Sequence, residues 1–310
     1  MRITLAGTTV MRIGAGPGQP ERNTGSAAAL AAKVNPIAVT GSTGNIGGRV
    51  ARRLAAYGVR QRLLVRDPSR APQLPAAEVA QAQYADSAAV RKTLSGVDTL
   101  LMVSGSEAPD RVAQHRSFID AAAEAGVGHL VYTSFVNARP NATFTLARDH
   151  WATEEHIRAS GLRFTFLRDN GYADFLPALV GEDGVIRGPA GEGRVAAVAQ
   201  DDIAEVATVV LVSPASHAGM TYDLTGPDAL TLDEVAATIS AATGRTVTYY
   251  PETIEEAYAS RAGFGAPDWQ LEAWISTYTA IGAGEMDVVS GDIPTITGHP
   301  ATSLAALLAR

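Results

Sequence analysis

Cysteine is absent from this sequence of 310 residues, which excludes disulfide bonds, thiolate nucleophiles and thiolate metal sites. Lysine is almost absent: Lys33 and Lys92 are the only two, so no mechanism can draw a lysine from beyond residue 92. No apolar run reaches the roughly 18 residues that a membrane span requires. Basic charge is not in excess, since the formal net charge is -7. We therefore expect a soluble, cytoplasmic protein that acts on a small molecule, with no nucleic acid and no membrane as partner.

Apolar residues, in contrast, make up 46% of the chain, enough to bury the core of one large domain or of two moderate ones. Residues 1–34 stand apart because they are rich in Gly, Ala, Thr and Pro and show no sustained periodicity. We expect 1–34 to be a disordered N-terminal extension. A misassigned start codon and a transit peptide are the alternatives.

From Pro36 onward, short apolar runs alternate with amphipathic helical segments, a pattern typical of βαβ units and a parallel sheet. Strands are predicted at 37–40, 62–65, 78–82, 99–103, 129–133, 164–167 and 221–224. Helices are predicted from about residue 46 to Gly58, which suits the position after a helix end, and at 88–94, 111–125, 151–160 and 202–212.

This order predicts an α/β fold with a Rossmann-type, doubly wound parallel sheet and a smaller C-terminal substrate lobe. The nucleotide-binding domain would span 35–175 and be completed by about 202–225. Residues 176–201 and 226–310 would form the lobe, because glycine and proline interrupt the alternation there. Thr231 and Glu234 form a capping-box pattern that opens a helix within it.

A glycine-rich turn follows the first strand, with Gly41, Gly44 and Gly47 at three-residue intervals. Such a turn directs backbone N–H groups and the helix dipole at a phosphate, and the missing Cβ atoms permit close approach. It indicates dinucleotide binding, although glycines here could also serve only tight turning and helix packing. The contacts expected from this loop are Gly41, Thr43, Gly44, Asn45, Ile46 and Gly47.

The second strand ends at Arg66, where a guanidinium can pair with the 2′-phosphate of NADP. NADP is therefore the expected cofactor. Arg70 is either a second phosphate contact or a solvated surface charge. NAD is the less favoured alternative. If the register of the second strand end were one residue later, the Asp67 carboxylate could bind the ribose 2′-hydroxyl of NAD.

Several segments together resemble one family, from about residue 36 to the end of the chain. They are Ile37-Ala38-Val39-Thr40-Gly41-Ser42-Thr43-Gly44-Asn45-Ile46-Gly47, Leu64-Val65-Arg66-Asp67-Pro68, Tyr132-Thr133-Ser134, His150 through Glu155, Leu167-Arg168-Asp169-Asn170 and Thr297-Gly298-His299-Pro300-Ala301-Thr302-Ser303-Leu304. In combination they resemble the NmrA-like group of atypical short-chain dehydrogenases, and within it the bacterial NADPH:quinone oxidoreductases.

The resemblance implies further cofactor contacts. Gln83 occupies a position where the family commonly has an acidic residue that meets the adenine amino group, so this chain departs from the family pattern there. Gln83 and the next residue, Tyr84, are both expected cofactor contacts. Ser104 and Gly105, together with Ser106, would lie along the cofactor. Small residues are equally expected in any tight turn between a strand and a helix.

The Tyr-x-x-x-Lys pair of carbonyl-reducing short-chain dehydrogenases aligns with Trp151 and Glu155, and neither can replace it. Ser134 stands where the family has a serine and would orient a substrate or merely cap a turn. His150 is a candidate proton source or a structural histidine. A quinone-like acceptor makes the loss tolerable, because its oxyanion is stabilised and solvent can protonate it.

Tyr172 and Phe175 follow a strand end and could wall a flat aromatic substrate, with Tyr172 a weak catalytic candidate. Core packing is their alternative role. The other constellations predict no chemistry and no metal. Asp201 and Asp202 suit a helix N-terminus, His150 and His156 are six apart and share no helical face, and Trp269, Trp274 and Tyr278 are expected to pack the small lobe or a subunit contact.

These observations favour an NADPH-dependent oxidoreductase that transfers hydride to a quinone-like or conjugated carbonyl acceptor without a Tyr–Lys pair. The alternative is a redox-sensing regulator of NmrA type that binds NADP without turning it over. An epimerase or lyase that uses a bound cofactor ranks third, since it would need the missing acid–base pair. The protein is expected to be a monomer or a homodimer.

Overall fold

The computed structural model describes residues 35–310, so the extension expected at 1–34 lies outside the described residues. A seven-stranded sheet forms its centre, with strand order β3-β2-β1-β4-β5-β6-β9 and every neighbouring pair parallel. The strands are β1 (Ile37–Thr40), β2 (Gln61–Val65), β3 (Ala77–Gln81), β4 (Thr99–Met102), β5 (His129–Phe135), β6 (Arg163–Asp169) and β9 (Thr221–Leu224). The predicted doubly wound α/β fold is confirmed. Its winding reverses between β1 and β4, the point where such sheets bind ligands.

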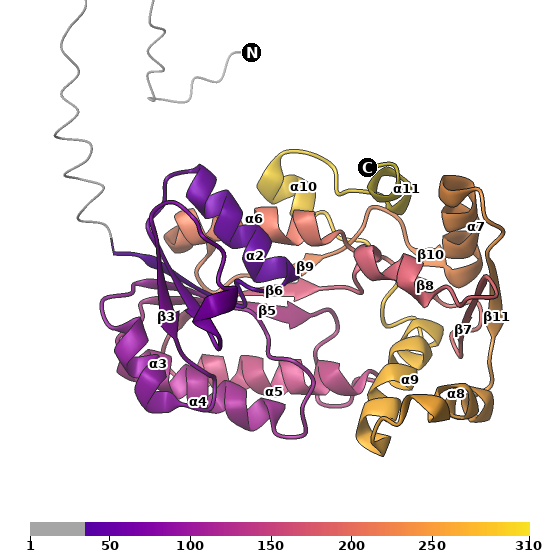
Figure 1. Ribbon diagram of the computed structural model, residues 1–310, viewed down its shortest axis with the longest axis horizontal. Helices are drawn as coiled ribbons and strands as arrows, with labels where there is room; N and C mark the ends of the chain where they lie inside the picture. Colours follow the sequence, from indigo (N-terminus) through magenta and orange to yellow (C-terminus); the bar gives the residue numbers. More distant parts are fainter. Residues whose placement is uncertain (1–34) are drawn as a thin grey trace, which may run out of the picture. The chain divides into compact units, whose positions relative to one another are not determined.

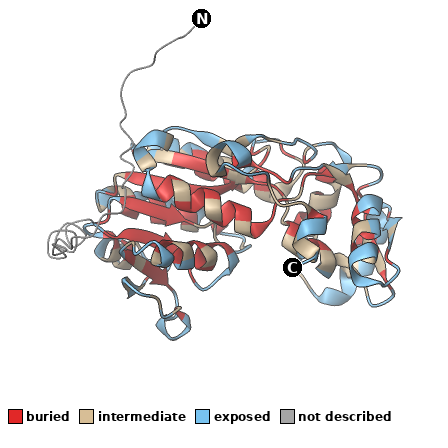
Figure 2. Cartoon of the chain, turned by 90° about the horizontal axis from the view of Figure 1, so that it is seen from above, coloured by how far each residue is buried: buried red, intermediate tan, exposed pale blue. Residues whose placement is uncertain are grey.

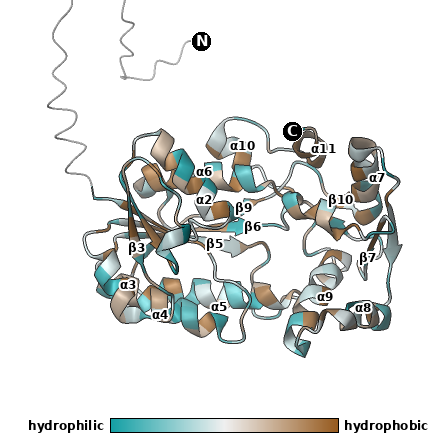
Figure 3. Cartoon of the chain, in the orientation of Figure 1, coloured by the Kyte–Doolittle hydropathy of each residue, from teal (hydrophilic) through white to brown (hydrophobic). Residues whose placement is uncertain are grey.

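Helices cover both faces of this sheet (Figure 1). One face carries α2 (Asn45–Ala56) and α6 (Gln200–Val212), and the other carries α3 (Ser87–Leu94), α4 (Arg111–Glu124) and α5 (Thr145–Ala159). Adjacent strand residues serve opposite cores: Val39 packs under α2 and α6, whereas Ala38 packs against the α3–α5 layer. Because both faces are covered, the central strands β1, β4 and β5 are buried along nearly all of their length (Figure 2), and apolar residues predominate in the interior of the sheet (Figure 3). The edge strands β3 and β9 are mostly half-buried or exposed.

A second cluster of short elements follows β6. It contains the 3-10 helix η2 (Ala173–Leu179), the parallel pair β7 (Val185–Gly188) and β11 (Thr248–Pro251), and the antiparallel pair β8 (Arg194–Val195) and β10 (Leu230–Thr231). Its helices are α7 (Leu232–Thr243), α8 (Ile254–Arg261), α9 (Asp268–Gly282) and α11 (Leu304–Leu308). Helix α10 (Asp292–Thr297) packs instead on α6, and Ile293 belongs to the core under α2, so the expected range 226–310 does not follow the packing there.

Local signals account for some boundaries and miss others. The capping box of Thr231 and Glu234 is present at the start of α7, and Asp201 lies in the first turn of α6, as predicted. Helix α5 begins at Thr145 rather than at the predicted residue 151. The sequence did not reveal this earlier start because the N-cap residue, Phe144, has no side chain that can cap a helix. The short strands of the second cluster were not predicted, since two to four residues carry no sustained alternation.

A buried carboxylate ties α5 to the sheet. Glu154 is fully buried, and its two oxygens accept hydrogen bonds from the Arg168 guanidinium on β6 at 2.8 and 2.7 Å. Ser134 on β5 donates its hydroxyl to Glu154 at 2.6 Å, and Arg158 adds a further contact at 3.1 Å. Glu154 therefore joins one helix to two adjacent strands.

We predict that Glu154→Ala lowers the free energy of unfolding by about 3–5 kcal/mol, because it leaves the Arg168 charge without its partner in a largely buried site. Urea denaturation measures this. Glu155→Ala is the matched control. Glu155 is exposed and, among the described residues, pairs only with Arg158, at 2.6 Å, so a change of at most about 1 kcal/mol is expected. Equal losses in the two variants would contradict the role assigned to Glu154.

Candidate functional site

The glycine turn between β1 and α2 leaves no room for side chains. Gly41 has a φ of +64°, and a Cβ there would lie 3.0 Å from the Val103 Cβ. A Cβ on Gly47 would lie 2.5 Å from the carbonyl oxygen of Thr40, closer than real contacts allow. The Gly44 N–H donates to the Gly41 carbonyl at 2.8 Å and closes the turn. Helix α2 thus begins directly over the end of β1.

The start of α2 suits a bound phosphate. Gly44 is its N-cap and supplies no side-chain oxygen, and the first turn contains no acidic residue. Thr43, Gly44 and Asn45 are exposed, while the Ser42 hydroxyl is buried and has no hydrogen-bond partner within residues 35–310. The first N–H groups of a helix need acceptors, and an anion is stabilised there by the dipole. The loop therefore fits the pyrophosphate of a dinucleotide.

A hydrogen-bonded triangle holds the carboxyl ends of β1 and β4 together. The Val103 N–H donates to Thr40 Oγ1 at 2.9 Å, and Thr40 Oγ1 also lies 2.7 Å from the Tyr84 hydroxyl. That hydroxyl donates to the Val103 carbonyl. Burial raises the pKa of Tyr84, which keeps it a neutral phenol. The Tyr84 side chain thus helps to shape the switch point.

The turn after β4 is fixed by hydrogen bonds to β5 and to α4. The Ser104 N–H donates to Thr133 Oγ1 at 2.8 Å, and the Gly105 N–H donates to His115 Nε2 at 2.8 Å. Thr153 contacts His115 Nδ1 at 2.9 Å. Burial, with a smaller contribution from Arg111, lowers the pKa of His115 to about 3, so the ring is neutral and can accept at Nε2. Ser104 and Gly105 consequently line the sheet edge beside the glycine turn.

Arg66 and Gln83 are exposed just beyond β2 and β3, on the same edge of the sheet as the glycine turn. The Asp67 carboxylate, in contrast, is engaged in local hydrogen bonds. Its Oδ1 accepts the Ser69 N–H at 3.0 Å and the Ser69 hydroxyl at 2.7 Å, so it caps the short 3-10 helix η1 (Pro68–Arg70). Those hydrogen bonds lower the pKa of Asp67. Arg70 is exposed at the end of η1.

The loop residues, Arg66, Gln83, Ser104 and Gly105 lie along one edge of the sheet, but two other candidates are buried and engaged in internal hydrogen bonds. The Ser134 hydroxyl is used by Glu154. His150 is buried, with Nε2 3.1 Å from an Arg111 nitrogen and Nδ1 2.9 Å from the Tyr132 hydroxyl. Burial and then Arg111 lower the pKa of His150 well below its usual value, which favours the structural role.

Trp151 and Glu155, the residues aligned with the catalytic pair, lie on α5. Trp151 is half-buried and Glu155 is an exposed partner of Arg158. Neither residue lines the apolar cavity next to Tyr172 and Phe175, which is described below.

Tyr172 and Phe175 line a cavity of about 730 Å³ between η2, β7 and α9. Its wall is mostly apolar and aromatic and includes Leu179, Phe264, Trp274, Tyr278, Ile281 and Met286. Phe175 is 51% exposed, which is unusual for a ring that merely packs a core. Trp274 and Tyr278, expected only to pack the lobe or a subunit contact, form part of this wall. Trp269 is half-buried on the same helix and is not in the wall.

The pocket's two cations are already paired. Arg261 bonds Glu252 at 2.8 Å and stacks 5.2 Å over the Tyr278 ring. Arg187 pairs with Asp183 at 2.6 Å. Because both positive charges have partners, the pocket is better suited to an uncharged, flat ligand than to an anion.

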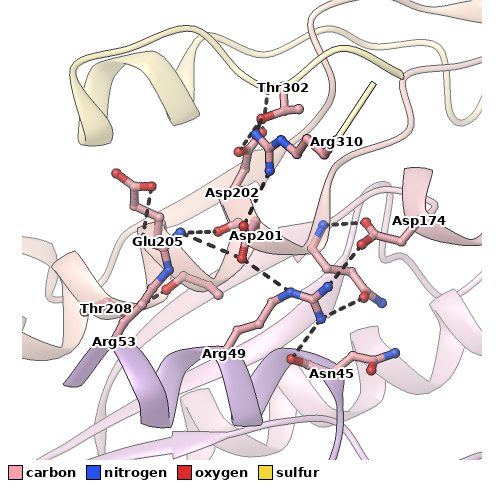
Figure 4. Close-up of polar contacts among 12 residues, drawn as sticks. Asn45, Arg49, Arg53, Asp174, Asp201, Asp202, Glu205, Thr208, Thr302 and Arg310 are labelled. Carbon is pink, nitrogen blue, oxygen red and sulfur yellow. Dashed lines mark hydrogen bonds and ion pairs between the residues drawn. The ribbon is translucent and has the colours of Figure 1, made fainter. Parts of the chain in front are cut away.

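A polar network connects α2 to this pocket (Figure 4). The Arg49 guanidinium contacts Asp174 of η2 at 3.3 Å, Asp201 of α6 at 3.3 Å and the Asn45 carbonyl at 3.3 Å. Asp174 also accepts the Gln200 N–H at 2.8 Å. One side chain thus links the helix that starts at the glycine turn with the segment that carries Phe175.

Sequence reasoning did not identify Arg111, His115 or Thr133 as parts of this edge. These residue types are common in proteins, and their hydrogen-bond partners are distant along the chain, so no local sequence pattern identifies them as site residues. Among residues 35–310 no group of three or more His, Asp or Glu side chains is placed to hold a metal ion. In the same range, no helix has both the length and the apolar character to cross a membrane.

Comparison with known proteins agrees with this geometry. The chain is 35% identical over 277 residues to quinone oxidoreductase 2 of Escherichia coli, covering 87% of this chain and 96% of that protein. It is 32% identical over 274 residues to the NAD(P)H azoreductase of Xenophilus azovorans, covering 87% and 95%. The structure of Citrobacter sp. triphenylmethane reductase complexed with NADP(H) matches with a TM-score of 0.79 at 31% identity, covering 89% of this chain and 100% of that one.

Residues 33–279 match the NmrA-like family as a whole. The resemblance drawn from the sequence motifs is confirmed, and the chain belongs to the NmrA-like family.

Proposed function

We propose that this protein is an NADPH-dependent oxidoreductase that transfers hydride to a quinone-like or other conjugated acceptor. The observation that carries the proposal is the apolar, aromatic pocket of about 730 Å³ beside the carboxyl edge of a sheet whose glycine turn suits a pyrophosphate. Similarity to a quinone oxidoreductase, an azoreductase and a triphenylmethane reductase supports it, because all three names describe reductases.

The cofactor would lie along the sheet edge. The N–H groups at the start of α2, with Gly41, Thr43, Gly44, Asn45, Ile46 and Gly47, would hold the pyrophosphate. Arg66 would pair with the 2′-phosphate, Gln83 and Tyr84 would contact the adenosine, and Ser104 and Gly105 would pass toward the nicotinamide. NADP is favoured over NAD because Asp67 is engaged by Ser69, whereas the exposed Arg66 guanidinium at the end of β2 has no hydrogen-bond or ion-pair partner within residues 35–310.

The acceptor would enter the pocket walled by Tyr172 and Phe175. The bound cofactor supplies hydride, and the chain lacks the Tyr–Lys pair that assists ketone reduction. Reduction of a quinone consumes one hydride and one proton and yields the hydroquinone and NADP⁺. The intermediate oxyanion is conjugated and weakly basic, so protonation does not demand a lysine-activated phenol. We assign residues 35–175 and 202–225 to cofactor binding, and 176–201 and 226–310, apart from α10, to the acceptor side.

Arg66→Ala should raise the Kd for NADPH about 10- to 100-fold, since a hydrogen bond to a charged group contributes about 1.5–3 kcal/mol. The Kd for NADH should stay unchanged, because NADH lacks the 2′-phosphate. Fluorescence titration of the reduced cofactors measures both values. Asp67→Asn is the matched control and should leave both constants unaltered. Unchanged NADPH affinity in Arg66→Ala, or weakened NADH binding in Asp67→Asn, would contradict the assignment.

Mixing the protein with NADPH and benzoquinone in a stopped-flow instrument should oxidise NADPH faster than the protein-free reaction. Tyr278→Ala should raise the KM for the quinone and leave NADPH affinity intact, because it opens the pocket wall without touching the sheet edge. The regulator hypothesis predicts the opposite result: NADPH binds, but no acceptor, quinone or azo compound, is reduced above the background rate.

A further inference from the structure

Asp169 is a buried carboxyl group at the last residue of β6. It is 1% exposed, and its Oδ2 accepts the Tyr172 hydroxyl at 3.3 Å. Its Oδ1 is buried without a hydrogen-bond partner within residues 35–310. Its strand neighbours in register are the apolar Phe135 and Leu224. An acidic side chain in such surroundings is costly to keep charged.

The neighbouring charges do not compensate Asp169. Arg168 is adjacent in sequence but sends its guanidinium to Glu154. No ion pair to Asp169 forms in the described part of the chain, and there its carboxyl group accepts a hydrogen bond only from Tyr172. Burial raises the pKa of Asp169 well above its usual value, and the phenol offsets only part of that effect. Near neutral pH the carboxyl therefore holds a proton far more readily than a surface aspartate.

Tyr172 connects this carboxyl to the pocket. Its ring lines the cavity and lies 5.9 Å from the Phe175 ring, while its hydroxyl turns back to the carboxyl edge of the sheet. Burial raises the pKa of Tyr172 well above its usual value, Asp169 adds to this, and Arg111 from α4 opposes it, with Tyr132 of β5 as a minor neighbour. Tyr172 is consequently a neutral phenol, hydrogen-bonded to a carboxyl and placed where the acceptor is expected.

We propose that Tyr172 donates the proton that accompanies hydride transfer and that Asp169 is the positioning residue that supplies its replacement. This rests on the proposed function, whose NADPH provides the hydride. The Tyr172 O–H bond breaks as the new O–H or N–H bond forms on the reduced acceptor. The phenolate oxygen then takes the proton of the Asp169 carboxyl, and solvent reprotonates the carboxylate between turnovers. The pair fills the place of the absent Tyr–Lys pair with a proton reservoir instead of a fixed positive charge.

The protonation of Asp169 can be tested without cofactor or turnover. A carboxyl whose pKa is higher in the folded protein contributes stability that is fully present below its unfolded pKa of about 3.9 and is lost as pH rises through the folded pKa. Asp169→Asn removes this titration and retains an oxygen that can accept from Tyr172. The melting temperature of the variant minus that of the wild type should therefore increase as pH rises from about 4 to 8, because only the wild type loses this contribution to stability. A difference that does not change with pH would overturn the proposal.

Turnover tests the relay itself. Tyr172→Phe should lower kcat by about 100-fold or more with little change in KM, the usual scale of a lost general acid. Asp169→Asn should also lower kcat and should remove one ionisation from its pH profile. Asp223→Asn is the matched control, because Asp223 is a half-buried carboxylate on neighbouring β9 that does not contact Tyr172, and its kcat should stay at the wild-type value.

A kcat that is unaffected in Tyr172→Phe, or an unaltered pH profile in Asp169→Asn, would overturn the relay while leaving the oxidoreductase intact. Failure of the wild type to reduce any acceptor would instead contradict the proposed function. The cofactor-free melting experiment separates the two cases, because it reports the protonation of Asp169 whether or not the protein turns over.

Discussion

The close approach of α2 to β1 is the constraint on which the rest of the site depends. Gly47 brings the helix against the Thr40 carbonyl at a distance that no Cβ would tolerate, and Gly41 supplies the positive φ that turns the chain into it. The helix N-terminus is thereby aimed along the carboxyl edge of the sheet. A bulkier residue at position 47 would lift the helix and with it both the N–H groups at the start of α2 and the Arg49 network that reaches η2.

Polar contacts then shape the edge on either side of that turn. Thr40, Tyr84 and Val103 close the gap between β1 and β4, and His115 holds the Gly105 N–H from below. The pocket beyond β6 is built differently, from aromatic and aliphatic side chains around paired arginines. The two surfaces meet near Tyr172, whose ring belongs to the pocket and whose hydroxyl belongs to the sheet edge.

The sequence predicted the sheet and its cofactor edge because these depend on local patterns: apolar runs, the glycine spacing and the residue at each strand end. Arg66 and Gly41 could be placed from neighbours alone. The pocket could not, since Trp274 and Tyr278 line the same cavity as Tyr172 from a helix about a hundred residues further along the chain, and a spacing of four suits core packing equally well. His150 and Ser134 could not be judged either, because their roles depend on Arg111 and Glu154, which only the tertiary fold brings to them.

The make-up of the pocket wall has a chemical consequence. Quinones and related conjugated acceptors are electrophiles that form adducts with thiols and primary amines. The chain has no cysteine, Lys92 lies exposed on α3 away from the pocket, and Lys33 lies outside the described residues. The pocket wall contains no thiol and no primary amine; its polar side chains are arginines, phenols, an indole and hydroxyls, and its one sulfur is the Met286 thioether. Such a wall would resist covalent alkylation by acceptors of the proposed quinone-like class.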